Sequence, residues 1–495
     1  MKALASLLLL VWVPVAAIAQ QPTSAASRPA PIVHHAVSAD AAAQAAFDRG
    51  LLDYYAYNPE AAEHEFYTAA DLDPKSAMAW WGIALSNAPN LNVPPTDDRN
   101  DRAQEAIENA KALESGASAE DKLLIDAAAA RFDDDTKASA AALLVNYRDA
   151  LQRIAQAYPA DPDAAALYAE AALYVAVGDR SENREGWSAA QRAAYVATVA
   201  ALLPYFQASL AKFPKHVGLL HFYIHAAQLA NRSQDAISAA TQLAAFAFPA
   251  EDSHLTHMPG HTFFDVGMYD AALDVGRRSV AMDYAAIDCC HPGYYSSARY
   301  YHAHNVAFVL YAMAQTGHAA EAVAVAKRAG IPILNARALV AAGQWQSVLA
   351  TRDDGSGPAI PFARALAYAK LGDVSKAQTE LNRLPAAPAA HPARAAIESA
   401  MRDIVQAQVA LDQGNAAQAL ALLKQASDEA TRGDRLEGGA EIPTLYYYSP
   451  HLALAELAIK MGETSVARAA LEAELAASPR SAAATQELGQ LGGSK

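Results

Sequence analysis

The sequence is poor in cysteine and in charged residues. Its only cysteines among 495 residues are the adjacent Cys289 and Cys290, so no disulfide framework holds the chain together. A strained disulfide, a soft metal ligand and two buried thiols all stay open for this pair. Charged residues make up 18%, with a formal net charge of −15, and no basic stripe occurs. This balance argues against nucleic acid and anionic membrane surfaces as partners.

The short motifs of the common enzyme classes are also missing. The sequence contains no Gly-x-Ser-x-Gly, no phosphate-binding loop, no dinucleotide fingerprint and no Cys/His nucleophile arrangement. Hydrolases, kinases and dehydrogenases of the common types therefore lose support. Whether the protein is an enzyme stays open at this point.

Long apolar runs are absent except at the N-terminus. There Lys2 precedes an apolar run and small residues before Gln20, which is typical of a secretory signal. We expect residues 1–19 to be a signal peptide and the mature chain to be periplasmic, without an integral membrane segment. Residues 20–40 mix Pro, Ser and Ala and predict a flexible lead-in, in which His34 and His35 are solvated.

What the chain has in abundance is alanine and leucine, in a sequence that is 53% hydrophobic, and this favours an almost all-helical protein. Gly50, Ala62, Phe66, Ala69 and Pro74 fall at the spacing of one tetratricopeptide unit. A glycine at a helix end is also followed five residues later by alanine, again and again. These pairs are Gly267/Ala272, Gly317/Ala322, Gly372/Ala377, Gly414/Ala419 and Gly462/Ala467, with Asn231/Ala236 in the same form.

This recurrence predicts an all-α fold, an α-solenoid of antiparallel helix pairs in a tetratricopeptide-like right-handed superhelix. We expect a main solenoid over residues 41–383 and a shorter group of repeats over residues 393–487. The Pro/Ala stretch from Leu384 to Pro392 is the predicted linker between them. Residues 488–495 are expected to be a disordered tail.

Several phrases resemble a poorly characterised group of bacterial tetratricopeptide-repeat proteins, among them HVGLLHFYIHA, HMPGH and GYYSSARYYHAHN. The resemblance extends over nearly the whole mature chain and implies an α-solenoid, but no activity. The chain departs from the group at Gly260, where Ser is usual, and at Ala307, where His is usual. The second departure affects any metal site on that helix, for which His302 is the substitute.

Two histidine pairs occupy the same phase of the repeat. His221 and His225 lie 15 and 11 residues before Ala236, and His257 and His261 lie 15 and 11 residues before Ala272. Residues four apart share one face of a helix. We therefore predict that both pairs face the concave groove of neighbouring units. His304 lies one turn from the equivalent position in the next unit; the expected groove neighbours are His302, Glu170 and Tyr301.

Histidines four apart can offer two nitrogens to one ion, and such ligands suit copper, zinc or iron better than calcium or magnesium. The two pairs predict one four-ligand site or two sites with open positions. One uncertainty is Pro259, which at a helix start would leave His257 in a cap. The alternative function is a non-catalytic scaffold whose groove receives a peptide, protein or small molecule; plain packing of the histidines is the third interpretation.

Overall fold

The computed structural model describes residues 32–493 except residues 38–39, 95, 133–137, 179–186, 290–294, 354, 356, 385–391, 438–448 and 480. Helix is the regular structure in these residues, and no strand occurs among them. The all-α prediction is therefore confirmed. The predicted signal peptide, the Pro/Ala linker at residues 385–391 and the side chains of Cys289 and Cys290 lie outside the described residues.

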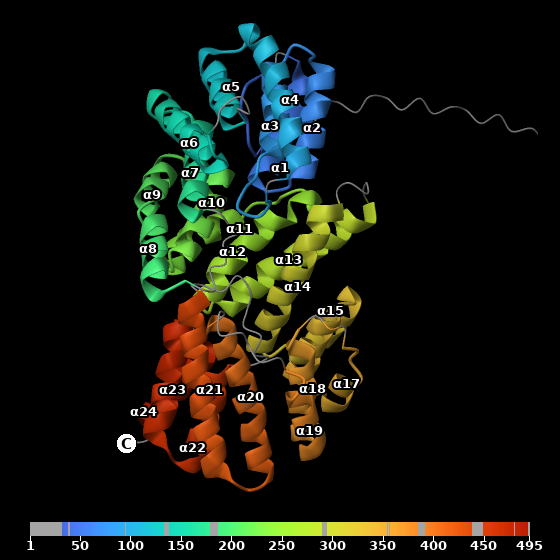
Figure 1. Cartoon of the computed structure of the whole chain (residues 1–495), viewed down its shortest axis with the longest axis vertical. Coiled ribbons are helices and arrows are strands. Elements are labelled where there is room, and N and C mark those ends of the chain that lie inside the picture. Colours follow the sequence, from blue (N-terminus) through green and yellow to red (C-terminus); the bar gives the residue numbers. More distant parts are fainter. Residues whose placement is uncertain are drawn as a thin grey trace, which may run out of the picture.

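Consecutive helices pack against each other as antiparallel pairs, and the pairs stack into an elongated molecule (Figure 1). The N-terminal units form its upper part in that view. Their helices are α1 (Ala41–Tyr55), α2 (Pro59–Leu72), α3 (Ala77–Asn87), α4 (Asp97–Leu113), α5 (Ala119–Arg131), α6 (Ala140–Ala157), α7 (Pro162–Val177), α8 (Ala189–Ala200) and α9 (Leu203–Lys212).

The middle of the molecule consists of three helix pairs whose first helices contact one another in succession, α10 against α12 and α12 against α14. Helix α10 also contacts α1, so the N-terminal unit closes over this row. The six helices are α10 (Val217–Leu229), α11 (Ile237–Ala244), α12 (Ser253–Asp265), α13 (Tyr269–Cys289), α14 (Tyr295–Gln315) and α15 (Ala319–Ala329).

The C-terminal units form the lower part in Figure 1 and have hydrophobic cores of their own. The Tyr269 hydroxyl at the start of α13 donates to the Ser478 hydroxyl at 3.0 Å, which ties them back to the middle. Their helices are α16 (Pro332–Ala341), α17 (Trp345–Leu349), α18 (Ala359–Lys370), α19 (Val374–Leu381), α20 (Pro392–Asp412), α21 (Ala416–Glu437), α22 (Pro450–Met461), α23 (Thr464–Ala477) and α24 (Ala482–Gly493).

The recurring helix-end residues adopt the conformation that their sequence pattern predicts. Gly267 has φ 78° and Asn231 has φ 55°, and both follow the first helix of a pair. This left-handed region is open to glycine and tolerated by asparagine. Gly317, Gly372, Gly414 and Gly462 have the same positive φ. The repeat phase read from the sequence is therefore the phase of the helix pairs.

Phe66 shows why small residues recur on the first helices. A Cβ atom on Gly50 of α1 or on Gly82 of α3 would lie within 2.9 or 2.4 Å of the Phe66 ring. This ring on α2 is fully buried between them. A larger residue at either glycine would therefore displace the Phe66 ring from its place between α1 and α3.

The expectation of no integral membrane segment is compatible with the described helices. The segment Ala190–Lys212 is long and apolar enough to span a membrane by length and composition, with 22% of its most apolar window buried. The structure divides this segment into α8 and α9 with a turn at residues 201–202. A single segment of this kind is weak evidence for a membrane span, since core helices pass the same test.

Candidate metal centre

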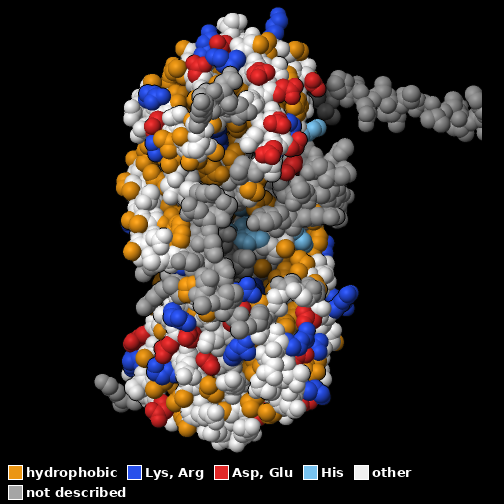
Figure 2. Space-filling model, viewed as in Figure 1, with side chains coloured by type: hydrophobic (Ala, Val, Ile, Leu, Met, Phe, Trp, Pro, Cys, Tyr) orange, Lys and Arg blue, Asp and Glu red, His pale blue; other side chains and the backbone are white. Residues whose placement is uncertain are grey.

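Six histidines lie in two groups of three, each with one ligand atom per residue within 4.8 Å of the others. The first triad is His221 and His225 on α10 with His254 on α12. The second triad is His257 and His261 on α12 with His304 on α14. Figure 2 shows histidine side chains gathered near the middle of its face, at the height of α12 and α14 in Figure 1.

Helix α12 supplies half of the six rings. His254, His257 and His261 are three and four residues apart, a spacing that places them along one face of a helix. Pro259 lies inside this helix, so the prediction that it might begin the helix and leave His257 in a cap is wrong. Proline removes one backbone hydrogen bond there, but it leaves the three rings in phase.

The second triad brings three Nε2 atoms together. Nε2 of His261 lies 3.0 Å from Nε2 of His257 and 3.2 Å from Nε2 of His304. For metal–nitrogen bonds of 2.0–2.1 Å, three ligands in tetrahedral or trigonal geometry would be roughly 3.3–3.6 Å apart. The nitrogens are therefore close to the separation that a shared ion requires.

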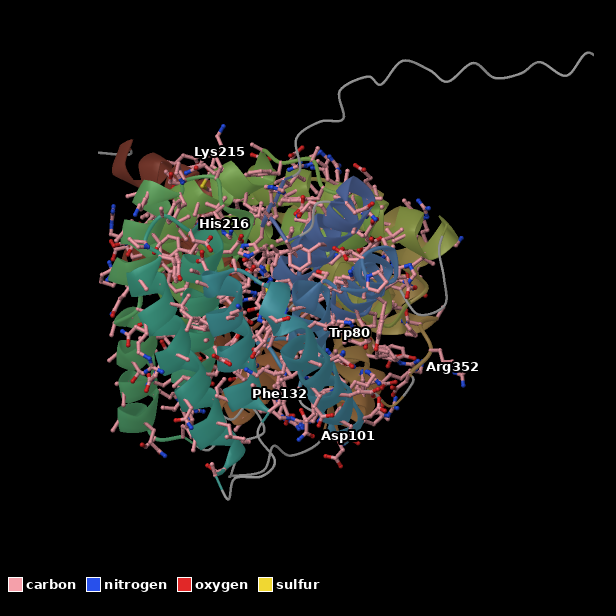
Figure 3. All side chains as sticks on the ribbon, turned by 90° about the horizontal axis from the view of Figure 1, so that it is seen from above. Trp80, Asp101, Phe132, Lys215, His216 and Arg352 are labelled. Atoms are coloured by element: carbon pink, nitrogen blue, oxygen red, sulfur yellow. The ribbon has the colours of Figure 1, made fainter. Side chains whose placement is uncertain are left out.

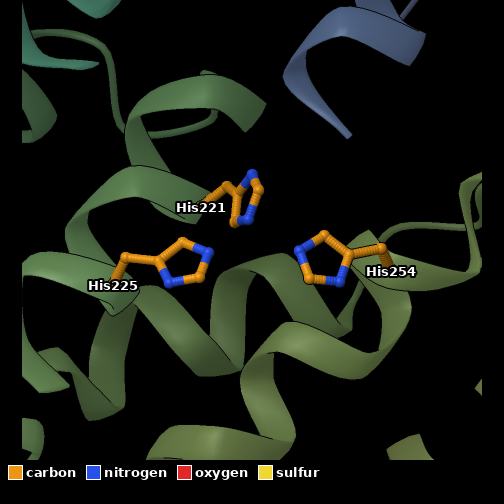
Figure 4. Close-up of side chains that lie close together, drawn as sticks. All are labelled: His221, His225 and His254. Atoms are coloured by element: carbon orange, nitrogen blue, oxygen red, sulfur yellow. The ribbon is translucent and has the colours of Figure 1, made fainter. Parts of the chain in front are cut away.

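In the first triad, His221 and His225 face His254 from a different helix, as the close-up shows (Figure 4). The ring centroids of His221 lie 4.8 Å from those of His225 and 5.0 Å from those of His254. Nδ1 of His221 lies 2.6 Å from the carbonyl oxygen of Tyr55 and donates to it, while its buried Nε2 has no hydrogen-bond partner. A ligand histidine is commonly held in this way, with one nitrogen anchored and the other available.

The second triad has a comparable support. The side-chain amide of Gln228 on α10 lies 3.1 Å from Nδ1 of His261, and Gln228 is buried. This contact fixes the ring whose Nε2 faces the other two histidines. The direction differs from that in the first triad, because the amide nitrogen of Gln228 donates to Nδ1 of His261, whereas the Tyr55 carbonyl accepts from Nδ1 of His221.

An aromatic ring lies against all three members of each triad. The Phe308 ring centroid lies 4.8, 4.7 and 4.8 Å from those of His257, His261 and His304. On the first triad, the Tyr57 ring lies 4.8, 5.8 and 6.2 Å from its three members. Tyr57 has φ 53°, a conformation rare for a bulky residue, which is maintained by the packing around it.

The surroundings keep these histidines neutral. Burial lowers the pKa of His221 and of His304 to about 4. Burial, followed by the proximity of the other histidines, lowers the pKa of His254, His257 and His261 well below the ordinary value. Neutral imidazole is the form that binds a metal, so five of the six rings are in their ligand form at pH 7.

The histidines that were predicted to face a concave groove are largely buried. His221 is fully buried, and His257 and His261 are 1% and 5% exposed. The N-terminal unit covers them, since α1 packs on α10 and Tyr57 follows α1. Only His225 and His304 keep partial exposure, one in each triad.

The five histidines predicted as ligands all belong to the two triads, but the two predicted pairs are divided between them. His221 and His225 belong to one triad, and His257 and His261 to the other. The arrangement therefore matches two sites with open positions rather than one four-ligand site. The sequence prediction missed His254, although it stands one helical turn before His257 in the phrase HLTHMPGH.

The predicted neighbours Tyr301 and His302 differ in their contacts. The Tyr301 ring stacks on His254 with centroids 4.3 Å apart, so it borders the first triad. Nδ1 of His302 instead lies 3.1 Å from the buried carboxylate of Asp283, which also accepts from the Asn305 amide. His302 therefore belongs to neither triad and does not replace the missing histidine at position 307.

Glu170 is also engaged elsewhere. Its carboxylate accepts a hydrogen bond from the Tyr54 hydroxyl at 2.6 Å and is buried. Burial raises the pKa of Glu170, and the charge of Arg131 opposes this shift. Its part in the structure is a buried contact between α7 and α1, and it belongs to neither triad.

A third group of possible ligand atoms is as closely spaced as the triads, but two of its three members are carboxylates. His35, Asp161 and Asp163 lie within 4.8 Å of one another, and His35 also bonds to Asp121 at 3.0 Å. His216 adds a bond from Nε2 to Asp163 at 3.0 Å. We call these five residues the acidic network. Figure 3 labels His216 among the helices, whereas Lys215 beside it extends outward.

The acidic network corrects the interpretation of His35 as a solvated linker residue, whereas His34 keeps an exposed side chain. Val33 is 5% exposed within the main core, and His34 bonds to Asp48 at 2.8 Å. Burial alone would lower the pKa of His35, but Asp121 and Asp163 raise it to about 10. The described residues 32–37 are therefore held to the first units by charged hydrogen bonds.

The helix pairs define the class of protein, an all-α tetratricopeptide-like array with buried histidine triads. No protein-family model matches the chain, and no curated protein matches its sequence.

Among solved structures the chain is similar at low scores to three repeat proteins. The human IFIT1 dimer with m7Gppp-AAAA has a TM-score of 0.32 at 11% identity, covering 90% of this chain and 91% of that one. The APC/C hetero-tetramer Cut9-Hcn1 has a TM-score of 0.28 at 13% identity, covering 91% and 90%. The P58(IPK) TPR domain has a TM-score of 0.24 at 12% identity, covering 85% and 99%. These scores carry no argument about function.

Proposed function

We propose that this protein binds transition-metal ions, one at each histidine triad. The observation that carries the proposal is the convergence of three Nε2 atoms in the second triad, with 3.0 and 3.2 Å between neighbours. Linear hydrogen bonds account for only one of these two contacts, because Nε2 of neutral His261 carries either one proton or one lone pair. Copper, zinc and iron are the ions that imidazole ligands suit.

Support also comes from how the rings are held. His221 donates Nδ1–H to a backbone carbonyl, and Gln228 contacts the Nδ1 of His261. The first contact leaves Nε2 of His221 for a ligand bond because its proton is on Nδ1, and the second holds the His261 ring in place. With three protein ligands per ion, one coordination position stays open at each site, as in metal centres that bind a further small molecule.

A scaffold function is compatible with this proposal. Arrays of helix pairs present extended surfaces to partner proteins or peptides. The inner row of first helices is closed around the triads, so a macromolecular partner would use another face. From the N-terminal pattern alone, we also propose that the chain is exported to the periplasm.

The test is elemental analysis of protein purified without a histidine tag and reconstituted with copper, zinc or iron. We expect two equivalents of metal per chain, and their loss in the double variant His221→Ala/His257→Ala. The matched control is His318→Ala, an exposed histidine at the start of α15. Circular dichroism checks that each variant keeps its helices. A wild-type chain that retains no ion from any of the three metals would overturn the proposal.

A further inference from the structure

The triads have no charge of their own to offset a bound ion. Among the described residues, no aspartate or glutamate oxygen belongs to either triad. The carboxylate that influences His304, that of Asp283, is already bonded to His302 and Asn305. A bound cation would therefore keep its charge in buried surroundings, and the desolvation energy rises with the square of that charge.

The two triads are also direct neighbours. The rings of His254 and His257 lie 6.3 Å apart between centroids, 27° from parallel, one turn apart on α12. Ions in both triads would repel each other through the protein interior. Because this energy scales with the product of the charges, two divalent ions repel about four times as strongly as two monovalent ions at the same separation.

The number of ligands points the same way. Each triad offers three nitrogens, and the neighbour that packs on all three rings of the second triad is the apolar Phe308. Zinc completes a tetrahedron with a fourth ligand. Copper in the +1 state forms stable complexes with three nitrogens and needs no fourth.

Resting on the metal-binding function proposed above, we infer that the triads are sites for copper in the +1 state, one ion in each. Helix α12 makes them a pair, because it supplies His254 to the first triad and His257 and His261 to the second. The partly exposed His225 and His304 are the rings at which each ion enters.

The experiment compares copper(I) and zinc(II) on the metal-free full-length chain. Copper(I) is titrated without oxygen against bicinchoninate, and zinc(II) against 4-(2-pyridylazo)resorcinol. We expect two copper(I) ions of similar affinity. For zinc we expect a second ion that binds at least about tenfold more weakly than the first, because of charge repulsion.

A matched pair of variants tests the ligand argument. Phe308→His adds a fourth nitrogen beside the second triad and should raise zinc affinity relative to copper(I) by about tenfold or more. Phe308→Leu keeps an apolar neighbour and should leave this ratio unchanged. Two tight zinc ions with no retention of copper(I) in the wild type would overturn the inference and leave metal binding standing. Retention of no ion at all would instead overturn the proposed function.

Discussion

Two buried histidine-rich regions of this molecule differ in their partners. In the triads, histidines face histidines, and burial lowers the pKa of His221 to about 4. In the acidic network, His35 faces carboxylates, which raise its pKa to about 10. The same side chain is thus a neutral imidazole in one place and a cation in the other. Closeness of ligand atoms does not separate the two, since all three groups fall within 4.8 Å.

The difference separates the proposed metal sites from an ion-pair network by the hydrogen bonds of their histidine nitrogens. In the acidic network the hydrogen bonds already satisfy the nitrogens of His35 and His216. In the first triad, Nε2 of His221 is buried without a partner. Unpaired buried nitrogen is unfavourable in an empty site, and a bound ion removes this penalty.

The largest effect is expected for the metal content of a variant that disrupts one triad and leaves the acidic network intact. His261→Ala removes the ring that lies within 3.2 Å of both other Nε2 atoms of the second triad. We expect metal content after reconstitution to fall from two equivalents to one. His35→Ala, the matched change in the network, should leave both ions in place. Elemental analysis after gel filtration measures this, and equal losses in the two variants would contradict the distinction.

The next effect concerns stability in the network. Asp163 accepts hydrogen bonds from the Tyr55 hydroxyl and His216 and pairs with His35, and these histidines hold its pKa well below the usual range against the effect of burial. Asp163→Asn leaves a buried cation short of its counterion, so we expect a loss of about 3–5 kcal/mol in the free energy of unfolding.

Guanidinium unfolding of the metal-free chain measures this loss from the shift in midpoint. Asp98→Asn is the control, because its side chain is 80% exposed and its ion pair on α4 lies at the surface. A loss below about 1 kcal/mol for Asp163→Asn would mean that the acidic network contributes no more to stability than an ordinary surface ion pair.

A smaller effect follows the pH. The pKa of His35 is raised on folding, from 6.5 to about 10. Its contribution to stability is therefore fully present below pH 6.5 and lost as the pH rises towards 10, because the unfolded chain releases that proton first. The stability difference between wild type and His35→Gln should shrink between pH 7 and pH 10.5 in urea unfolding. A difference that grows over this range would show that His35 is not held as a cation.

The smallest effect is expected at the edge of the network. His34 bonds to Asp48, but its side chain is 52% exposed. An exposed ion pair contributes about 0–1 kcal/mol, so His34→Ala should leave the unfolding midpoint almost unchanged. A loss as large as that of Asp163→Asn would mean that the segment containing residues 32–37 depends on this contact.

The fold and most of the triads could be predicted from the sequence because both are local patterns in a repeat. The phase of Gly267 and Asn231 placed the two His-x3-His pairs on equivalent helices. His254 was missed because it lies outside the two His-x3-His pairs, although it stands three residues before His257 and so faces the same side.

The rest depends on contacts between distant parts of the chain. His35 meets Asp121 across 86 residues, and the carbonyl of Tyr55 meets His221 across 166. The periodicity of the sequence does not reveal such pairs. The sequence therefore predicted a solvated lead-in and a concave groove lined by histidines. Glu170 likewise carries a carboxylate that could serve as a metal ligand. Only the structure shows that this carboxylate accepts a hydrogen bond from Tyr54 instead.

The central claim is that the histidine triads bind metal and the acidic network does not. The most direct measurement is an anomalous difference map from crystals of the full-length chain loaded with copper without oxygen. We predict one peak within bonding distance of the ring nitrogens of each triad and none between His35, Asp161 and Asp163. A peak in the acidic network with both triads empty would contradict the account.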